Sequence, residues 1–341
     1  MPIARLGRRV GLAVLHAYRN LFRPEAYHGR GRKPPFFEGW YFKLVDAHEH
    51  RRLVVIPGIY DATLPTQRHA FVQLFDGTRG KAWYLRYPYE SFRAHRHRFE
   101  IELGPNRFGR DGLELDLDLG DGARCHGHVG FDGVVGWPVT LRSPGVMGWF
   151  AYLPVMECYH GVVGLDHGLH GHLHLDGERV SLLGGRGYIE KDWGQSFPQA
   201  WVWMQSNHFQ QRAVCITASV ALIPNLGRVF PGFIVGLWHR GTLHRFATYT
   251  GAKIESLRVD DERVQWVMRD RKHRLTLVAH RAETTMLPGP TIEGMRRDVH
   301  ETLRAEIDVR LEDRERGTVI FEGRGRSAGL EVMGDVQRLC R

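Results

Sequence analysis

The chain has 341 residues, of which 43% are hydrophobic and 25% charged, and its net charge at pH 7 is +9. These fractions exclude disorder over most of the length, and the absence of any run of about 18 apolar residues excludes a membrane-spanning helix. The four cysteines form no C-x-x-C pair, so we expect a reducing, cytoplasmic location and no disulfide scaffold. The positive charge is scattered arginine without a zinc finger or helix-turn-helix pattern, so we expect no nucleic-acid partner.

The first segment differs from the rest of the chain. Apolar residues recur at helical spacing over residues 3–22, with four arginines among them, which predicts an amphipathic basic helix within residues 1–24. Two interpretations remain open. The helix packs on the body of the protein, or it lies on an anionic membrane as a peripheral anchor at the inner face. Residues 25–35 are expected to form a linker because they follow Pro24 and contain a GRGRKPP run.

Period-two alternation dominates after residue 36. Residues 113–119 read LELDLDL, which places leucines on one face of a strand and acids on the other, and Asp121-Gly122 follows as a hairpin turn. Residues 304–311 repeat this pattern. The only helix that we expect in this region is a short one near 292–301. Many short strands with one apolar face predict an all-β protein of antiparallel sandwich or barrel type.

The length of the strand region is too great for one small barrel, so we expect two tandem β units. The glycine-rich stretch at 183–187 is the best candidate for their boundary. The predicted domains are therefore 36–185 and 186–341, preceded by the helix and the linker.

Two segments combine aromatic and ionisable residues. The first is FFEGWYFK at 36–43, and the second runs from Tyr188 through EKDWGQSFP to Phe209. Trp201, Trp203 and Gln205 alternate onto one face of the predicted strand that follows. An apolar, proline-interrupted stretch that contains Trp149 and leads to His160 lies between the two segments.

These surroundings indicate acid chemistry. Burial raises the pKa of a carboxyl group, and an uncharged carboxyl can donate a proton near neutral pH. Aromatic faces beside it can stabilise a developing carbocation. Glu38, Glu190 and Asp192 are the candidate acids. The competing interpretation is that the aromatics fill a core and the acids form ion pairs, with Lys191 as a partner that would keep a carboxyl ionised.

The histidines allow a separate test for a metal site. His170, His172 and His174 would share one strand face, but the leucines between them take the other face and the core. Imidazoles that point into solvent lack the shaped cavity of a metal site. We therefore predict no metal.

Three segments together carry a family resemblance: FFEGWYFK, then GVVGWP followed by PGVMGWFAYLPVMECYHGVV, and GRGYIEKDWGQSFPQAWVWMQSNHF. With AGLE at 328–331, they make the chain from about Phe36 to its end resemble the tocopherol cyclase family. The resemblance implies two lipocalin-like β-barrel units, related to the carotenoid hydratases. It also implies an intramolecular lyase, classed among the isomerases, that cyclises a prenylated hydroquinone to a chromanol without a cofactor.

The resemblance and the residue chemistry together suggest roles. Asp192 or Glu190 is the predicted proton donor, Glu38 is a third candidate, and His208 or His160 is the predicted acceptor of the phenolic proton. Gln205 would orient the ring hydroxyl. The predicted substrate-binding residues are Trp40, Tyr41, Trp149, His160, Trp193, Trp201, Trp203 and Gln205.

Two other functions remain open at this level. A non-enzymatic carrier of a prenyl lipid would use the same apolar barrel. A hydratase would protonate the same kind of alkene and trap the cation with water.

Overall fold

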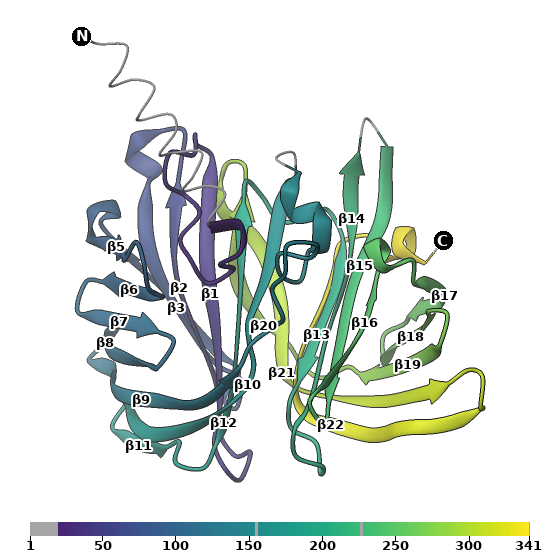
Figure 1. The fold of residues 1–341 in the computed structure, drawn as a ribbon. Helices are drawn as coiled ribbons and strands as arrows, with labels where there is room; N and C mark the ends of the chain where they lie inside the picture. The colour runs from purple at the N-terminus through teal and green to yellow at the C-terminus, as the bar shows by residue number, and fades with distance from the viewer. Residues whose placement is uncertain (1–19, 154–155, 226–227, 341) are drawn as a thin grey trace.

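The structure, a computed structural model, describes residues 20–153, 156–225 and 228–340. Apart from the helical residues 20 and 21, the elements inside these ranges are β-strands and five short 3-10 helices, so the all-β prediction is confirmed for them (Figure 1). The predicted helix at 1–24 falls almost entirely outside the described residues. No helix among the described residues is long and apolar enough to span a membrane. The 3-10 helices are η1 (Pro65–Gln67), η2 (Tyr89–Ser91), η3 (Gly148–Tyr152), η4 (Thr248–Thr250) and η5 (Val336–Leu339).

The first antiparallel sheet has 12 strands in the order β4-β3-β2-β1-β12-β10-β9-β8-β7-β6-β5, and β11 pairs with β10. Its strands are β1 (Phe36–Val45), β2 (Arg52–Asp61), β3 (His69–Asp76), β4 (Lys81–Tyr87), β5 (Phe92–Ala94), β6 (Glu100–Leu103), β7 (Asn106–Gly109), β8 (Gly112–Gly120), β9 (Ala123–Val135), β10 (Cys158–Leu175), β11 (Glu178–Ser181) and β12 (Arg186–Gly194).

The second antiparallel sheet has 10 strands in the order β16-β15-β14-β13-β22-β21-β19-β18-β17, and β20 pairs with β21. Its strands are β13 (Trp201–Ser206), β14 (Val214–Asn225), β15 (Arg228–His239), β16 (Thr242–Ala247), β17 (Lys253–Val259), β18 (Arg263–Arg269), β19 (His273–His280), β20 (Thr285–Thr291), β21 (Gly294–Asp313) and β22 (Thr318–Met333).

Local sequence explains most of these strands. In β8 the four leucines are buried and the acids between them are exposed, as the alternation predicts. Asp121 and Gly122 both have positive φ values, of 52° and 79°, which suits a two-residue hairpin turn between β8 and β9. The strand predicted at 304–311 lies within β21 with the same alternation.

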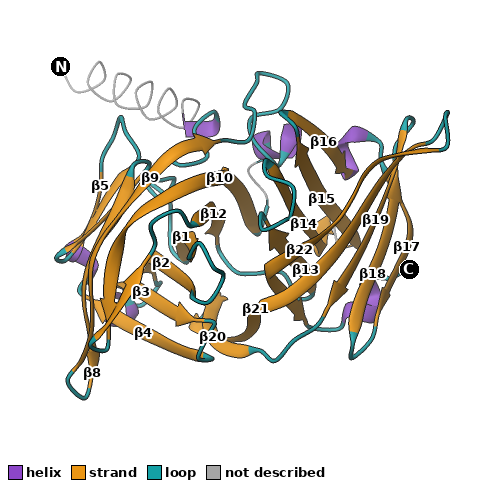
Figure 2. Cartoon of the chain, turned by 90° about the horizontal axis from the view of Figure 1, so that it is seen from below, coloured by secondary structure: helices purple, strands orange, loops and turns teal. Residues whose placement is uncertain are grey.

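Each sheet curls around its own core. In the first sheet, Trp83 of β4 and Phe92 of β5 pack against one apolar cluster although these strands end opposite edges of the sheet. In the second, Phe246 of β16 and Leu257 of β17 share one cluster in the same way. Figure 2 shows the two curled sheets side by side. Two β units are therefore present, each with an apolar core.

A third cluster joins the sheets. It contains Tyr41 and Tyr188 from the first sheet and Trp201, Trp203 and Leu303 from the second. The second sheet also hydrogen-bonds to the first, because the Gln73 side chain donates to the Pro288 carbonyl oxygen of β20 at 3.1 Å. Chemistry at this junction can draw on residues from both halves of the chain.

Two details differ from the predictions. β12 pairs with β1 and β10 in the first sheet, so the change of sheet falls between Gly194 and Trp201 and not at residue 185. Gly184 and Gly185 lie in the turn before β12, whereas Gly187 is already part of that strand. No helix forms at 292–301, because Ile292 and Glu293 are the turn between β20 and β21 and the following residues continue as a strand.

Candidate active site between the two sheets

The site is built on β1 and β12, which are neighbours in the first sheet. Gly39 lies opposite Asp192 and Tyr41 opposite Glu190 in the register. Because side chains alternate along a strand, Tyr41, Glu190 and Asp192 share one face, which points toward the second sheet. Trp40 points the other way, into the first sheet's own core, and Lys191, which lies between the two acids, points to the same side as Trp40.

The opposite face holds a buried ion pair. Lys191 and Glu38 both have 0% side-chain exposure and contact each other directly. The lysine Nζ lies 4.4 Å from the ring centroid of Trp40 and 4.8 Å from that of Trp193. The backbone N–H of His28 donates to both Glu38 oxygens, at 3.0 and 2.9 Å. The ion pair is therefore enclosed by protein atoms, and neither side chain lines the cavity described below.

The ion pair fixes the charge of Glu38. Burial raises the pKa of this carboxyl, but the Lys191 charge and the hydrogen bonds from His28 and Lys191 outweigh it, so the pKa lies below its ordinary value. Glu38 is thus the ionised partner of a lysine, which was the competing interpretation of the sequence. Trp40 and Trp193 surround the ammonium group and do not line the cavity described next.

A cavity of about 200 Å³ lies between the sheets. Its walls are mainly apolar, and its carboxyl groups come from both sheets. The lining includes Phe37, Tyr41, Met147, Phe150, Met156, His160, Glu190, Asp192, Phe197, Trp201, Trp203, Leu287, Val299, Glu301 and Glu331. Such an apolar space with a few polar groups is typical of a binding site for a small molecule.

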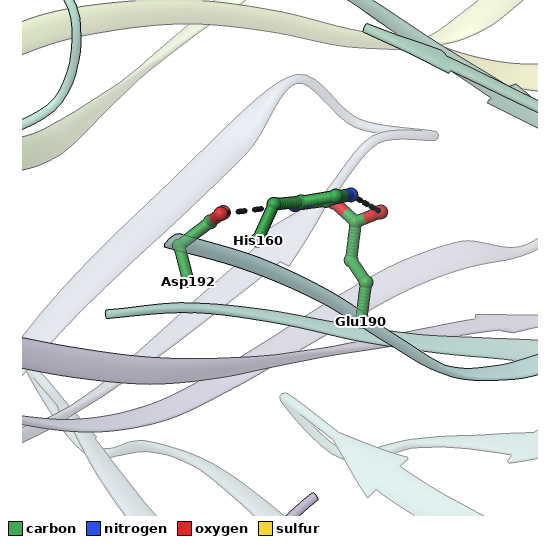
Figure 3. Close-up of side chains that lie close together, drawn as sticks. All are labelled: His160, Glu190 and Asp192. Carbon is green, nitrogen blue, oxygen red and sulfur yellow. Dashed lines mark hydrogen bonds and ion pairs between the residues drawn. The ribbon is translucent and has the colours of Figure 1, made fainter. Parts of the chain in front are cut away.

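Three polar residues of the first sheet meet at this cavity (Figure 3). His160 of β10 places Nδ1 2.9 Å from Asp192 Oδ1 and Nε2 3.6 Å from Glu190 Oε2. Burial lowers the pKa of the imidazole, but the charges of Asp192 and Glu190 and the hydrogen bond to Asp192 raise it to about 9. His160 is therefore an imidazolium at neutral pH, held between two carboxyl groups.

Glu190 is the most buried acid of this trio. Its Oε2 accepts hydrogen bonds from the Tyr188 hydroxyl at 2.6 Å and the Trp203 indole N–H at 3.2 Å. Burial raises its pKa to about 7, with a further increase from Asp192, against the opposing effects of His160 and the two hydrogen bonds. Glu190 can thus exchange a proton near neutral pH.

The same trio is the one group of potential metal ligands found among the described residues, with ligand atoms within 4.8 Å of one another. However, each imidazole nitrogen contacts a different carboxyl group. One ion could take only one of these nitrogens and would need the other carboxyl to move. The arrangement fits an imidazolium between two carboxyl groups better than a metal centre.

The second sheet contributes two more acids. Glu301 of β21 and Glu331 of β22 are partners in the register. The Tyr41 hydroxyl donates to Glu301 Oε1, and the Trp201 indole N–H donates to Glu331 Oε2, both at 2.5 Å. Burial raises the pKa of Glu301 to about 8 and holds that of Glu331 well above its ordinary value. This wall of the cavity therefore carries uncharged carboxyl groups.

Sequence comparison places this architecture in a family. A model of the tocopherol cyclase-like family matches residues 117–334, which is more than half of the chain. The chain belongs to the tocopherol cyclase-like family. The matched residues include His160, Glu190, Asp192, Glu301 and Glu331, whereas β1 lies outside them.

Two plant proteins are similar to this tocopherol cyclase-like chain. The probable chloroplastic tocopherol cyclase of Oryza sativa subsp. japonica is 28% identical over 215 residues, which cover 59% of this chain and 45% of the rice protein. The chloroplastic tocopherol cyclase of Zea mays is 29% identical over 215 residues, 59% of this chain and 44% of the maize protein. The match thus spans less than half the length of each plant protein.

Solved structures share the fold. The crystal structure of CghA with Sch210972 superposes with a TM-score of 0.54 over 89% of both chains at 11% identity. A putative AttH from Nitrosomonas europaea gives a TM-score of 0.51 at 12% identity, over 90% of this chain and 94% of that one. At these identities the similarity shows the fold alone.

The structure brings some of the predicted site residues of this family member together and separates others. Tyr41, His160, Glu190, Asp192, Trp201 and Trp203 all line the cavity. Gln205 is buried beyond it and accepts a hydrogen bond from Lys43 Nζ at 2.8 Å. Trp149 is 48% exposed on η3, although its neighbours Met147 and Phe150 reach the cavity.

His208 also lies apart from the cavity. It is buried, and neither ring nitrogen has a hydrogen-bond partner within the described ranges. Burial, followed by the charges of Lys43 and nearby arginines, lowers its pKa well below the ordinary value. His208 is a neutral buried imidazole and does not reach the acids of the cavity.

Sequence reasoning missed Glu301 and Glu331. One local signal was available for Glu331, because it ends the AGLE segment at 328–331 that resembles the family. Gly329 of that segment leaves room for an aromatic ring, since a Cβ there would lie 2.7 Å from the indole of Trp203. Glu301 has no comparable local signal, because charged residues are common along the whole of β21.

Proposed function

We propose that this protein is a cofactor-independent cyclase that converts a prenylated hydroquinone to a chromanol, with the cavity between the sheets as its active site. The observation that carries the proposal is the combination of uncharged carboxyl groups and indole rings in one apolar cavity. The named relatives, which are tocopherol cyclases, support the choice of substrate class.

The reaction is an isomerisation. A carboxylic acid of the cavity gives its proton to the less substituted carbon of the first prenyl double bond, which leaves a tertiary carbocation. The phenol oxygen forms a bond to the cationic tertiary carbon and then loses its own proton to a carboxylate. The proton count is unchanged over the cycle, and no electron donor or acceptor takes part.

The aromatic wall suits the cation. Tyr41 and Trp203 pack edge to face with ring centroids 5.5 Å apart, and Phe197 packs against Trp201 in the same way at 5.5 Å. Aromatic faces attract a cation by about 0.5 to 2 kcal/mol each. The low polarity of the cavity also keeps water, a competing nucleophile, away from the intermediate.

The polar trio suits the phenol. After the C–O bond forms, the oxygen is an oxonium ion and a strong acid, so even a weakly basic carboxylate can accept its proton. Asp192 and Glu190 stand on either side of the His160 imidazolium, which can donate a hydrogen bond to the hydroquinone oxygen. We assign the acceptor role to this trio.

Turnover in heavy water tests the proposal. Purified protein is incubated with a prenylated hydroquinone, with chelator present, and the products are separated by mass spectrometry. We expect a chromanol isomeric with the substrate. It should carry one deuterium on the ring carbon adjacent to the carbon that bears the new C–O bond, because the proton added there comes from an exchangeable acid. A product heavier by one water would indicate a hydratase, and bound but unchanged substrate would indicate a carrier. Either result would overturn the cyclase proposal.

A further inference from the structure

The two acids of the second sheet are held differently. Glu301 is only 2% exposed, and the Tyr41 hydroxyl occupies one of its oxygens. Glu331 keeps partial exposure where it lines the cavity. The Trp201 N–H occupies its Oε2, and no donor among the described residues contacts its Oε1. Glu331 therefore presents one free carboxyl oxygen to the cavity.

We propose that Glu331 is the catalytic acid that delivers the proton to the alkene, with Trp201 and Glu301 as its positioning residues. This proposal rests on the proposed cyclase function and names the donor within it. It replaces the two acids of β12 as the predicted donors and leaves them the role of acceptor.

The charges around Glu331 favour this role. Burial raises its pKa most, Glu301 raises it next, and Glu190 and Asp192 from β12 add to the increase, whereas the Trp201 hydrogen bond lowers it. No described cation forms a salt bridge with Glu331, in contrast to Asp192 beside His160. An acid with acidic neighbours and no cation stays protonated, which is the state that a donor needs.

Glu190 has the opposite arrangement. Its Oε2 receives hydrogen bonds from Tyr188 and Trp203 and lies beside the His160 imidazolium. Hydrogen bonds and a positive charge stabilise the carboxylate form. Across the cavity, the second sheet thus supplies the acid and the first sheet supplies the base.

In the proposed step the O–H bond of Glu331 breaks as the new C–H bond forms, and the carboxylate left behind faces the tertiary cation. The phenolic proton passes to Glu190 or Asp192 after ring closure. Exchange through solvent returns one proton to Glu331, so the enzyme ends each cycle in its starting state.

Glu331→Gln is the direct test, with Glu322→Gln as the matched control, because Glu322 is an exposed residue on the same strand. We expect kcat to fall by at least about 100-fold, the usual contribution of a general acid, with KM little changed. The control should behave as the wild type. Retention of more than about a tenth of kcat by E331Q would overturn the assignment to Glu331. If the wild type turns over, the cyclase proposal stands whatever the result for E331Q. If the wild type does not turn over, the cyclase proposal and the assignment to Glu331 both fail.

Two further variants keep the test open if E331Q does not fold. Glu301→Gln removes an acidic neighbour, so the pKa of Glu331 should fall and the alkaline limb of the kcat profile should move to lower pH. Trp201→Phe removes a hydrogen bond that lowers this pKa, so the limb should move to higher pH. Opposite shifts support Glu331 as the donor, whereas shifts in one direction or an unchanged limb would overturn it.

Discussion

The two faces of the strand pair β1 and β12 both carry acids among indole rings, yet they have different chemical roles. On one face Glu38 and Lys191 neutralise each other between Trp40 and Trp193, without access to a cavity. On the other face Glu190 and Asp192 line a cavity that faces the second sheet. An acid beside an aromatic residue is thus not enough to define a site. What separates the two faces is whether open space lies next to the acid: the Glu38–Lys191 pair is fully buried, whereas Glu190 and Asp192 line the cavity between the sheets.

The ion-pair face should give the largest effect on stability. Lys191→Met leaves the Glu38 carboxylate buried without its cation, and we expect the free energy of unfolding to fall by about 3–5 kcal/mol. Urea denaturation measures the change. Lys81→Met, at an exposed position of the same sheet, is the control and should cost little. A loss as small as that of the control would show that the Glu38 carboxylate does not need the Lys191 charge for stability.

The cavity face should show the opposite behaviour in an activity assay. Asp192→Asn removes the negative partner of His160, and we expect kcat to fall by about 100-fold while stability stays near that of the wild type. Asp298→Asn is the control, because Asp298 is exposed on β21. Unchanged turnover in D192N would remove Asp192 from the proposed machinery.

The raised pKa values of the cavity predict a pH dependence of stability. A group whose pKa is higher in the folded state binds more protons there, so stability is lost as pH rises through the window between the unfolded and folded values. The windows are 4.5 to about 7 for Glu190, 4.5 to about 8 for Glu301, and 6.5 to about 9 for His160.

These three groups therefore contribute a decline in the free energy of unfolding between about pH 5 and about pH 9. Lys43, His167 and His208, whose pKa values are lowered by burial, contribute changes of the opposite sign. Glu301→Gln should flatten this decline, because glutamine is uncharged at every pH. Denaturation curves at several pH values check both statements. A variant that keeps the full slope would mean that Glu301 titrates normally in the folded protein.

The smallest effect is expected at Trp149, which the sequence placed in the site. Its side chain is 48% exposed and stacks on Phe150 at 4.2 Å between ring centroids. Trp149→Ala should change stability by no more than about 0.5 kcal/mol, as exposed positions usually do, and should leave KM nearly unchanged. Phe150→Ala, which changes a residue of the cavity wall, should raise KM by more. A reversed order would show that Trp149 contacts the substrate.

The sequence alone was sufficient for many of the strands and for the segments that carry Tyr41, Glu190 and Asp192, but not for the strand at 294–301 or for the acids Glu301 and Glu331. Alternation in β8 and β21 follows from the two-residue period of a strand, which is a local property. The same period already assigned Trp201 and Trp203 to one face. The predicted boundary at residue 185 was wrong because β12 pairs with β1, a contact between residues far apart in the chain.

Only the tertiary structure decided which acids share a space. Glu38 on β1 and Glu190 on β12 have similar local surroundings, but their side chains lie on opposite faces of this strand pair. The partners on each face come from elsewhere in the chain. Lys191 closes one side, whereas Glu301 and Glu331 approach the other from a second sheet more than 100 residues later. The charge of a buried carboxyl depends on its neighbours in space, and those neighbours exist only after both sheets have folded and packed together.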